Sequence, residues 1–154
     1  MFLEELHAVK GLDPVADAFS GTVTSDIVEM KNYGSVLFVV HKGVGTTGTS
    51  TITVEASDDF SGSTTEAITF RYRAVTSTDV PGTLTQATTA GFTTTAGSSQ
   101  LYLVEVLAED LVDTGYSKVR LKAVEVADDP VLGGIAILMG KPRYTSEVDA
   151  TAVA

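Results

Sequence analysis

The chain has 154 residues, of which 44% are hydrophobic and 19% are charged, and its formal net charge is −10. This length suits about one domain with a real hydrophobic core, and the excess of acidic residues argues against sequence-independent binding to nucleic acid. The absence of Cys excludes disulfides, thiolate metal sites and a cysteine nucleophile. We expect no secretory leader and no membrane segment, because no basic stretch precedes an apolar one at the N-terminus and no apolar run approaches ~18 residues.

The two ends of the chain are expected to lie outside the folded domain. Residues 1–20 are predicted to form an N-terminal arm, in which a short helix from Phe2 to Val9 is followed by Gly11-Leu-Asp-Pro14. Residues 141–154 begin with Lys141-Pro-Arg-Tyr144 and finish in small residues, so they are predicted to form a C-terminal tail. Plain disorder is the alternative for both ends.

Between these ends, residues 21–140 are predicted to form an all-β domain, a jelly-roll β-sandwich of about eight strands. The chain contains 22 Thr, a β-branched residue that favours strands. Hydrophobicity alternates with a period of two, as where Ile52 and Val54 lie opposite Thr51 and Thr53. Short strands at this spacing, separated by Gly, Pro and Asp, are typical of sandwiches. We predict strands at residues 22–30, 35–41, 49–56, 66–75, 83–87 or 91–95, 100–107, 118–126 and 133–140.

Three of these strands are apolar on both faces. The runs at 36–40, 101–107 and 135–139 carry almost no polar side chain, Glu105 being the exception. Such runs are expected in central strands, or in strands whose outer face is covered by another surface.

A change of phase marks the strand at 118–126. Its inward-facing set is predicted to begin at Val119 and then to shift to Val124 and Val126. Because one extra residue redirects the side chains that follow it, the shift predicts a β-bulge near Ala123–Val124.

The stretch GVGTTG, Gly43 to Gly48, has the G-x-G-x-x-G spacing of a dinucleotide-binding loop. That loop requires a helix after the glycines, because the helix N-terminus meets the pyrophosphate. Residues 49–56 alternate instead and are rich in Thr, a poor helix former. We therefore predict a hairpin loop, with the glycines supplying positive φ angles, and no cofactor.

No catalytic or metal-binding constellation stands out. The two histidines, His7 and His41, have no G-x-S-x-G motif near them and are interpreted as surface or strand-end residues. The acidic pairs lack the D-x-[DN]-x-[DN]-G spacing of a calcium loop and are interpreted as solvated turns, with a weak Ca²⁺ site at 109–113 as the alternative. These pairs are Asp58-Asp59, Glu109-Asp110 with Asp113, and Asp128-Asp129.

Two strands carry basic side chains on the face predicted to meet solvent. Arg71 and Arg73 lie on one strand, and Arg120 lies between Lys118 and Lys122 on another. If the two strands were neighbours they would form one basic face. Such a face suits docking onto an acidic protein surface, since Arg binds carboxylates in a bidentate manner, and ordinary outward-facing charge is the alternative.

Three stretches together resemble a known family. They are 20–62, which includes "TSTITVEASDD"; 64–73, which includes "FRYR"; and 116–144, with "KVRLKAVEV" and "GGIAILMGKPRY". In their order along the chain and in their residue patterns, these stretches resemble the capsid cementing (decoration) proteins of tailed bacteriophages, specifically the jelly-roll cement family known from a Bordetella phage. The resemblance covers roughly residues 20–145.

The resemblance implies a structural virion protein, with no catalytic residues, no cofactor and no metal. Such a protein is made in the bacterial host cytoplasm, sits on the outer surface of the capsid, bridges major capsid protein subunits and forms a homodimer or homotrimer. Neither nucleic acid nor membrane is an expected partner. The candidate interface residues are Phe2, Leu3 and Leu6 as an apolar anchor, Arg71, Arg73 and Arg120 for docking, and Arg143 with Tyr144 at the C-terminal exit.

Two other functions compete with this hypothesis. The first is a non-catalytic glycan-binding module of a phage tail or cell surface, using the loops at 56–65 and 76–99. Its aromatic candidates are Tyr33, Phe60, Phe92 and Tyr116, although there is no Trp and these residues form no evident series. The second is a small hydrolase using paired acids, for which the sequence offers no recognisable constellation.

Overall fold

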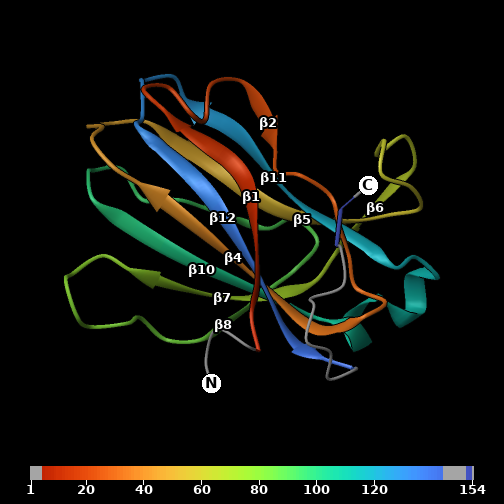
Figure 1. Ribbon diagram of the computed structural model, residues 1–154. Coiled ribbons are helices and arrows are strands. Elements are labelled where there is room, and N and C mark those ends of the chain that lie inside the picture. The colour runs from red at the N-terminus through yellow and green to blue at the C-terminus, as the bar shows by residue number, and fades with distance from the viewer. Residues whose placement is uncertain (1–4, 144–151, 154) are drawn as a thin grey trace.

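The computed structural model describes residues 5–143 and 152–153, which form a sandwich of two antiparallel sheets (Figure 1). The prediction of an all-β sandwich is confirmed. Within the described residues, no helix is long and apolar enough to cross a bilayer.

The first sheet has six strands in the order β1-β12-β4-β10-β7-β8. The second has the order β2-β11-β5-β6, with β3 paired to β11 and β9 paired to β5. The first sheet comprises β1 (His7–Val15), β4 (Tyr33–Lys42), β7 (Phe70–Val75), β8 (Thr85–Ala87), β10 (Gln100–Leu107) and β12 (Gly133–Pro142). The second comprises β2 (Thr22–Thr24), β3 (Val28–Glu29), β5 (Thr49–Ser57), β6 (Thr65–Ile68), β9 (Phe92–Thr93) and β11 (Lys118–Ala127), and a 3-10 helix, η2, spans Ala108–Thr114.

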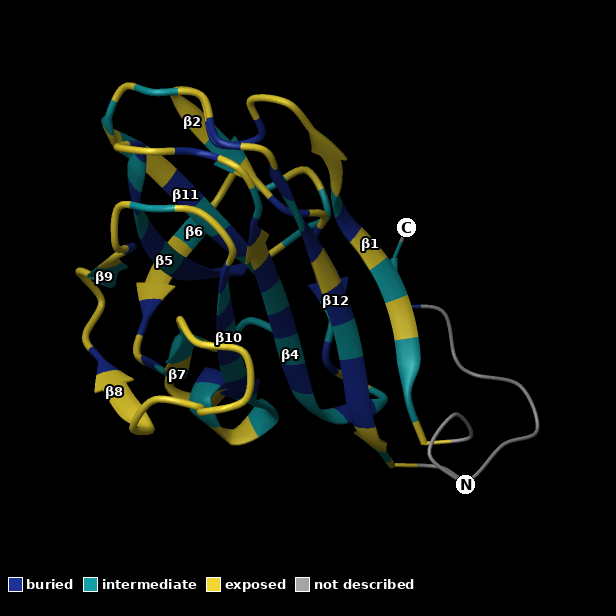
Figure 2. Ribbon diagram, turned by 90° about the vertical axis from the view of Figure 1, so that its left-hand side faces the viewer, coloured by how far each residue is buried: buried dark blue, intermediate teal, exposed yellow. Residues whose placement is uncertain are grey.

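The core lies between the sheets and follows from the alternation in the sequence. Phe38, Val104 and Ile137 are fully buried in the first sheet, and Val54 and Leu121 are fully buried in the second. Figure 2 shows the same alternation as buried and partly exposed bands along β4 and β12. Each central strand therefore contributes one of its two faces to the core.

The predicted N-terminal helix is wrong where the chain is described. Residues 7–15 form β1, which pairs with β12 at the edge of the first sheet. Gly11 suggested a turn, but it lies inside the strand, where an added Cβ would come 2.8 Å from Ile137 Cγ1. An edge strand also tolerates Pro14, whose missing N–H breaks no central ladder. Much of the predicted arm is thus part of the sandwich.

Two other strand predictions need correction. The predicted strand at 66–75 divides at Thr69 into β6 and β7, which belong to different sheets. The bulge in β11 lies between Glu125 and Ala127, beyond the predicted Ala123–Val124. Val124 and Val126 consequently lie outside the core, with 37% and 62% of their surfaces exposed.

The end of the chain contributes to the second sheet. Ala152 is fully buried, and its carbonyl oxygen accepts a hydrogen bond of 2.7 Å from the backbone N–H of Glu29 in β3. Val153 packs against the core. The alternative of plain disorder is therefore wrong for these two residues.

Candidate functional site

The outer face of the first sheet is unusually apolar. Along its central strands the side chains that point away from the core are aliphatic for the most part, and they are half-buried or exposed. They are Leu37 and Val39 on β4, Leu101, Leu103 and Leu107 on β10, Ala136 and Leu138 on β12, Val75 on β7 and Ala8 on β1. We call this set the apolar face. Contiguous apolar surface of this kind marks interaction sites in soluble proteins.

The strand register places these side chains in rows across the sheet. Val39 is the direct partner of both Ala136 and Leu103, and Leu103 is the partner of Arg73. In the next row, Leu37 lies between Leu138 and Glu105. Side chains in one row of neighbouring strands touch each other, so the apolar face is continuous from β12 to β10.

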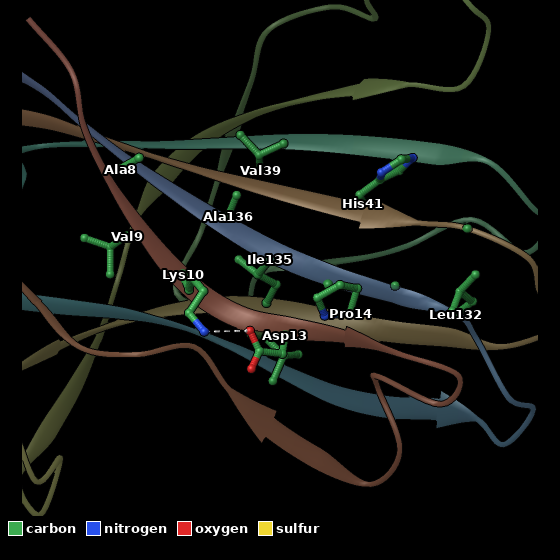
Figure 3. Close-up of a pocket in the computed structure, with 14 residues that line it drawn as sticks. Ala8, Val9, Lys10, Asp13, Pro14, Val39, His41, Leu132, Ile135 and Ala136 are labelled. Atoms are coloured by element: carbon green, nitrogen blue, oxygen red, sulfur yellow. Dashed lines mark ion pairs between the residues drawn. The ribbon is translucent and has the colours of Figure 1, made fainter. Parts of the chain in front are cut away.

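A groove of about 580 Å³ runs over β12 on this face (Figure 3). Its floor is low because the outward residues there are Gly134 and Ala136, which have little or no side chain. Val39 and His41 of β4 stand on one side, and β1 stands on the other. An added Cβ at Gly134 would come 2.9 Å from the Leu12 carbonyl oxygen, so close packing of β1 requires glycine there.

Charges around the apolar face balance. Arg71 forms an ion pair of 2.9 Å with Asp110 of η2. Glu105 is the cross-strand partner of Arg71, and Arg73 makes no ion pair with any described residue. Lys10 and Asp13, which line the groove, add an ion pair of 3.4 Å, so the acids and bases named here are equal in number, whereas the whole chain carries −10.

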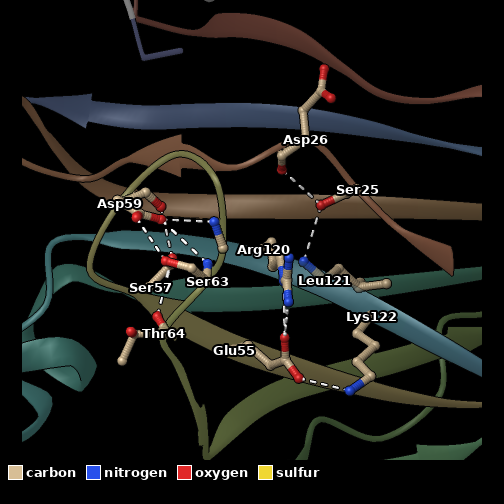
Figure 4. A network of polar contacts seen from close by, with 11 residues as sticks. Ser25, Asp26, Glu55, Ser57, Asp59, Ser63, Thr64, Arg120, Leu121 and Lys122 are labelled. Atoms are coloured by element: carbon tan, nitrogen blue, oxygen red, sulfur yellow. Dashed lines mark hydrogen bonds and ion pairs between the residues drawn. The ribbon is translucent and has the colours of Figure 1, made fainter. Parts of the chain in front are cut away.

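The predicted single basic face does not form. Arg71 and Arg73 lie on β7 of the first sheet, and Arg120 lies on β11 of the second. Arg120 and Lys122 both bind the carboxylate of Glu55, at 2.8 Å and 3.0 Å (Figure 4). Their charge is therefore compensated within the second sheet.

Glu55 is the centre of that network. Burial acts to raise its pKa, but hydrogen bonds from Lys122 and Arg120 outweigh burial, and the pKa lies below its ordinary value of 4.5. Lys118, on the same strand, lies 3.8 Å from Glu29 and 5.1 Å from the ring centre of Phe60. These contacts give the basic residues of β11 structural roles.

Two of the predicted interface residues lie at the same corner. Leu6 directly precedes β1, and a Cβ added at Gly140, near the end of β12, would come 3.6 Å from Leu6 Cδ2. Arg143 directly follows β12, and its backbone N–H donates a hydrogen bond of 2.9 Å to the Asn32 carbonyl. Phe2, Leu3 and Tyr144 lie outside the described residues, next in sequence to this corner. Arg71 and Arg73 are three strands away from β12.

The GVGTTG loop holds a carboxylate of its own chain. Asp129 Oδ2 accepts hydrogen bonds from the Thr47 N–H at 3.1 Å, from the Thr46 hydroxyl at 3.0 Å and from the Thr46 N–H at 3.4 Å. Hydrogen bonds from the Thr47 backbone and the Thr46 hydroxyl hold the pKa of Asp129 below its ordinary range. The amides of Thr46 and Thr47 are thus occupied by a carboxylate of the same chain.

The loop is not the predicted hairpin. It passes from β4 in the first sheet to β5 in the second. Its glycines lack positive φ angles and serve close packing instead. A Cβ at Gly48 would collide with the Asp129 carbonyl oxygen, and one at Gly45 would come 3.0 Å from Val131 Cγ2.

The remaining polar and aromatic candidates are engaged in structural contacts. Asp59 closes its own turn with Ser61 and Ser63, and the hydroxyl hydrogen bonds from these serines lower its pKa to about 2. Asp110, in the calcium alternative, is bound by Arg71 and by the Leu107 N–H. Across the described part of the chain, no three His, Asp or Glu gather as metal ligands would.

The aromatic candidates for glycan binding also make contacts within the chain. Tyr33 is 2% exposed and stacks on His7. The ring of Phe92 lies parallel to that of Tyr72, with 3.9 Å between centres. Phe60 is covered by Lys118, and Tyr116 packs against the core.

Comparison with known proteins gives a structural likeness. No protein-family model matches the chain, and no curated protein matches it. Among solved structures, the SPBc2 prophage-derived protein YomS is similar over 89% of this chain and 94% of its own, with a TM-score of 0.49 and 15% identity.

Proposed function

We propose that this chain is a structural protein of a tailed-phage virion, a cement protein that binds the outer surface of the capsid and bridges major capsid protein subunits. The observation that carries the proposal is the apolar face of the first sheet, because a soluble chain that acts alone has no need of such a surface. The resemblance of residues 20–62, 64–73 and 116–144 to the cement family supports the capsid as its place.

The charges and the corner formed by β1 and β12 fit this role. Acidic surface keeps the free protein soluble before assembly. The chain ends carry Phe2, Leu3, Leu6 and Tyr144 close in sequence to that corner, together with Arg143. Apolar side chains and Arg are common at the centres of protein interfaces. We assign the contact with major capsid protein to these ends, repeated around the shell so that many weak contacts add up.

The test is co-sedimentation with empty capsids of the phage that encodes the chain, at physiological salt. Expanded capsids are expected to pellet the protein, and capsids of an unrelated phage are not. A variant that lacks residues 1–6 keeps every described strand, since β1 begins at His7, and it is expected to bind at least tenfold more weakly. Leu84→Ser, at an exposed position before β8, is the control and should bind as the parent does.

Two results would contradict the proposal. If the unaltered protein stays in the supernatant with expanded capsids, the capsid role is wrong. If it binds capsids but the variant lacking residues 1–6 binds equally well, the assignment of the contact to the N-terminal end is wrong.

A further inference from the structure

We infer that residues 94–99 form a lid at one end of the sandwich, and that this lid opens while both sheets stay folded and uncovers the ammonium group of Lys42. The segment connects β9 in the second sheet to β10 in the first. Its fastening, the polar interior beneath it and a strained residue within it all point to local opening. The lid belongs to the free chain, so it is independent of the proposed function.

The lid is fastened by hydrogen bonds and buries no apolar side chain. Only Thr94 among its residues is buried. The Ser98 hydroxyl accepts a hydrogen bond of 3.2 Å from the Gly45 N–H and donates one of 2.7 Å to the Gly45 carbonyl. The Ser99 N–H donates to the Gly43 carbonyl at 2.8 Å. Segments with few buried apolar contacts open at a lower free energy than the core.

The interior beneath the lid is polar as well. The described part of the chain buries seven polar or charged residues, and four of them gather here: Lys42, Ser50, Thr94 and Gln100. Lys42 and Gln100 are direct cross-strand partners, and the Ser50 N–H donates a hydrogen bond of 2.9 Å to Thr94 Oγ1. Opening therefore admits water to groups that hydrate readily, and little hydrophobic stabilisation is lost.

Lys42 carries a charge that favours opening. Only 3% of this residue is exposed, and its ammonium donates hydrogen bonds to the carbonyl oxygens of Thr95 in the lid at 2.8 Å and of Gly48 at 2.9 Å. No carboxylate of a described residue forms an ion pair with it, and burial lowers its pKa below the ordinary value of 10.5. A buried ammonium with neutral partners alone is costly, and an open lid returns it to water.

The closed lid also holds a strained backbone. Ser99 has a φ of 57°, in the left-handed region that is unfavourable for a residue with a Cβ. Gly97 has a φ of 116° and gives the same short segment the conformational freedom of glycine. Opening releases the strain at Ser99.

The experiment measures how fast the Lys42 amine is acetylated in the folded protein by the N-hydroxysuccinimide ester of acetic acid. The amine attacks the ester carbonyl, an amide bond forms, N-hydroxysuccinimide leaves and the amine loses a proton to water. Because only an uncovered amine reacts, mass spectrometry of the digested chain reports how often the lid is open. Lys10, whose side chain is 86% exposed, is the internal reference, and Lys42 should react at least about tenfold more slowly.

Urea separates opening of the lid from unfolding of the whole chain. Opening exposes little surface, so the acetylation rate of Lys42 should hardly change with urea below the unfolding transition. If Lys42 were uncovered only by global unfolding, its rate would rise with urea as steeply as the unfolding equilibrium measured by circular dichroism. That result would refute the lid.

Two serine variants test the fastening. Ser98→Ala removes both hydrogen bonds to Gly45 and should accelerate acetylation of Lys42 about fivefold or more, with a melting temperature close to that of the parent. Ser63→Ala removes a hydroxyl that binds Asp59 in a different turn, so it is the matched control and should leave the rate unchanged.

Three further results would overturn the inference: equal rates in the two serine variants, a Lys42 that reacts as fast as Lys10, or a folded protein that is not acetylated at Lys42 at all. None of these measurements involves capsids, so failure of the lid and failure of the capsid role are distinguishable.

Discussion

Arg120 and Glu55 are direct cross-strand partners on β11 and β5, and a guanidinium nitrogen of Arg120 lies 2.8 Å from Oε2 of Glu55. Lys122 binds the other carboxylate oxygen at 3.0 Å. The Glu55 side chain is only 10% exposed, so the two cations depend on one largely buried anion. Removing one member of such a group leaves the others without compensation.

Glu55→Ala is therefore expected to lower the free energy of unfolding by about 2 kcal/mol, the scale of lost hydrogen bonds to charged groups. Glu55→Gln keeps the size and one acceptor and should cost about half as much. Urea denaturation measures both. Glu66→Ala, on an exposed position of β6, is the control and should change little. Equal losses for Glu55→Ala and Glu66→Ala would refute the structural role of the network.

The same carboxylate makes stability depend on pH. The pKa of Glu55 in the folded protein lies below 4.5, its ordinary value. Its contribution is thus present above pH 4.5 and is lost as the pH falls through the folded pKa. Urea denaturation at a series of acidic pH values should show a shallower decline for Glu55→Gln than for the parent. Parallel declines would show that Glu55 titrates alike in the folded and unfolded chains.

The loop at 43–48 is expected to loosen when its internal anion is removed. Asp129→Ala deletes the acceptor for the N–H groups of Thr46 and Thr47. Hydrogen exchange measured by NMR should become faster at these two amides, while core amides such as that of Val104 are unchanged. Asp128→Ala removes the neighbouring carboxylate and serves as the control. Unchanged exchange at Thr46 and Thr47 would mean that Asp129 does not hold the loop.

Alternation was sufficient to predict most strands of this fold, because it reports locally which side chains face the core. It could not assign strands to sheets, since pairing depends on packing between distant segments. The alternating pattern continues through Thr69, where the chain passes from one sheet to the other. The prediction of a single basic face was wrong for the same reason, because β7 and β11 belong to different sheets. β1 was missed because Gly11 and Pro14 suggest turns.

The apolar face could be predicted only in part. The runs at 36–40, 101–107 and 135–139 indicated strands with two apolar faces, and they are neighbours in the first sheet. The groove had a signal in Gly134 and Ala136, small residues at alternate positions of the last run. The position of this groove beside Val39 depends on the pairing of β12 with β4, which only the assembled sheet supplies.

The corrected register of β11 can be tested by paired substitutions. Val126 lies on the outside of the second sheet with 62% of its surface exposed, and Val119 is fully buried. Val126→Thr should change the free energy of unfolding by less than about 0.5 kcal/mol, as surface changes do. Val119→Thr buries a hydroxyl in the core and should cost about 1–3 kcal/mol. Similar losses at both positions would restore the predicted inward orientation of Val126.

The end of the chain is expected to stabilise the second sheet. The Ala152 carbonyl binds the Glu29 N–H at 2.7 Å, and Val153 packs against the core. Deleting residues 152–154 removes this hydrogen bond and exposes apolar surface beside β3, which should lower the free energy of unfolding by about 1–2 kcal/mol. The Glu29 amide should lose its protection from hydrogen exchange, and deleting Ala154 alone should have little effect. A full deletion that leaves both stability and the Glu29 amide unchanged would show that these residues do not hold β3, and that Val28 keeps its place through β11 alone.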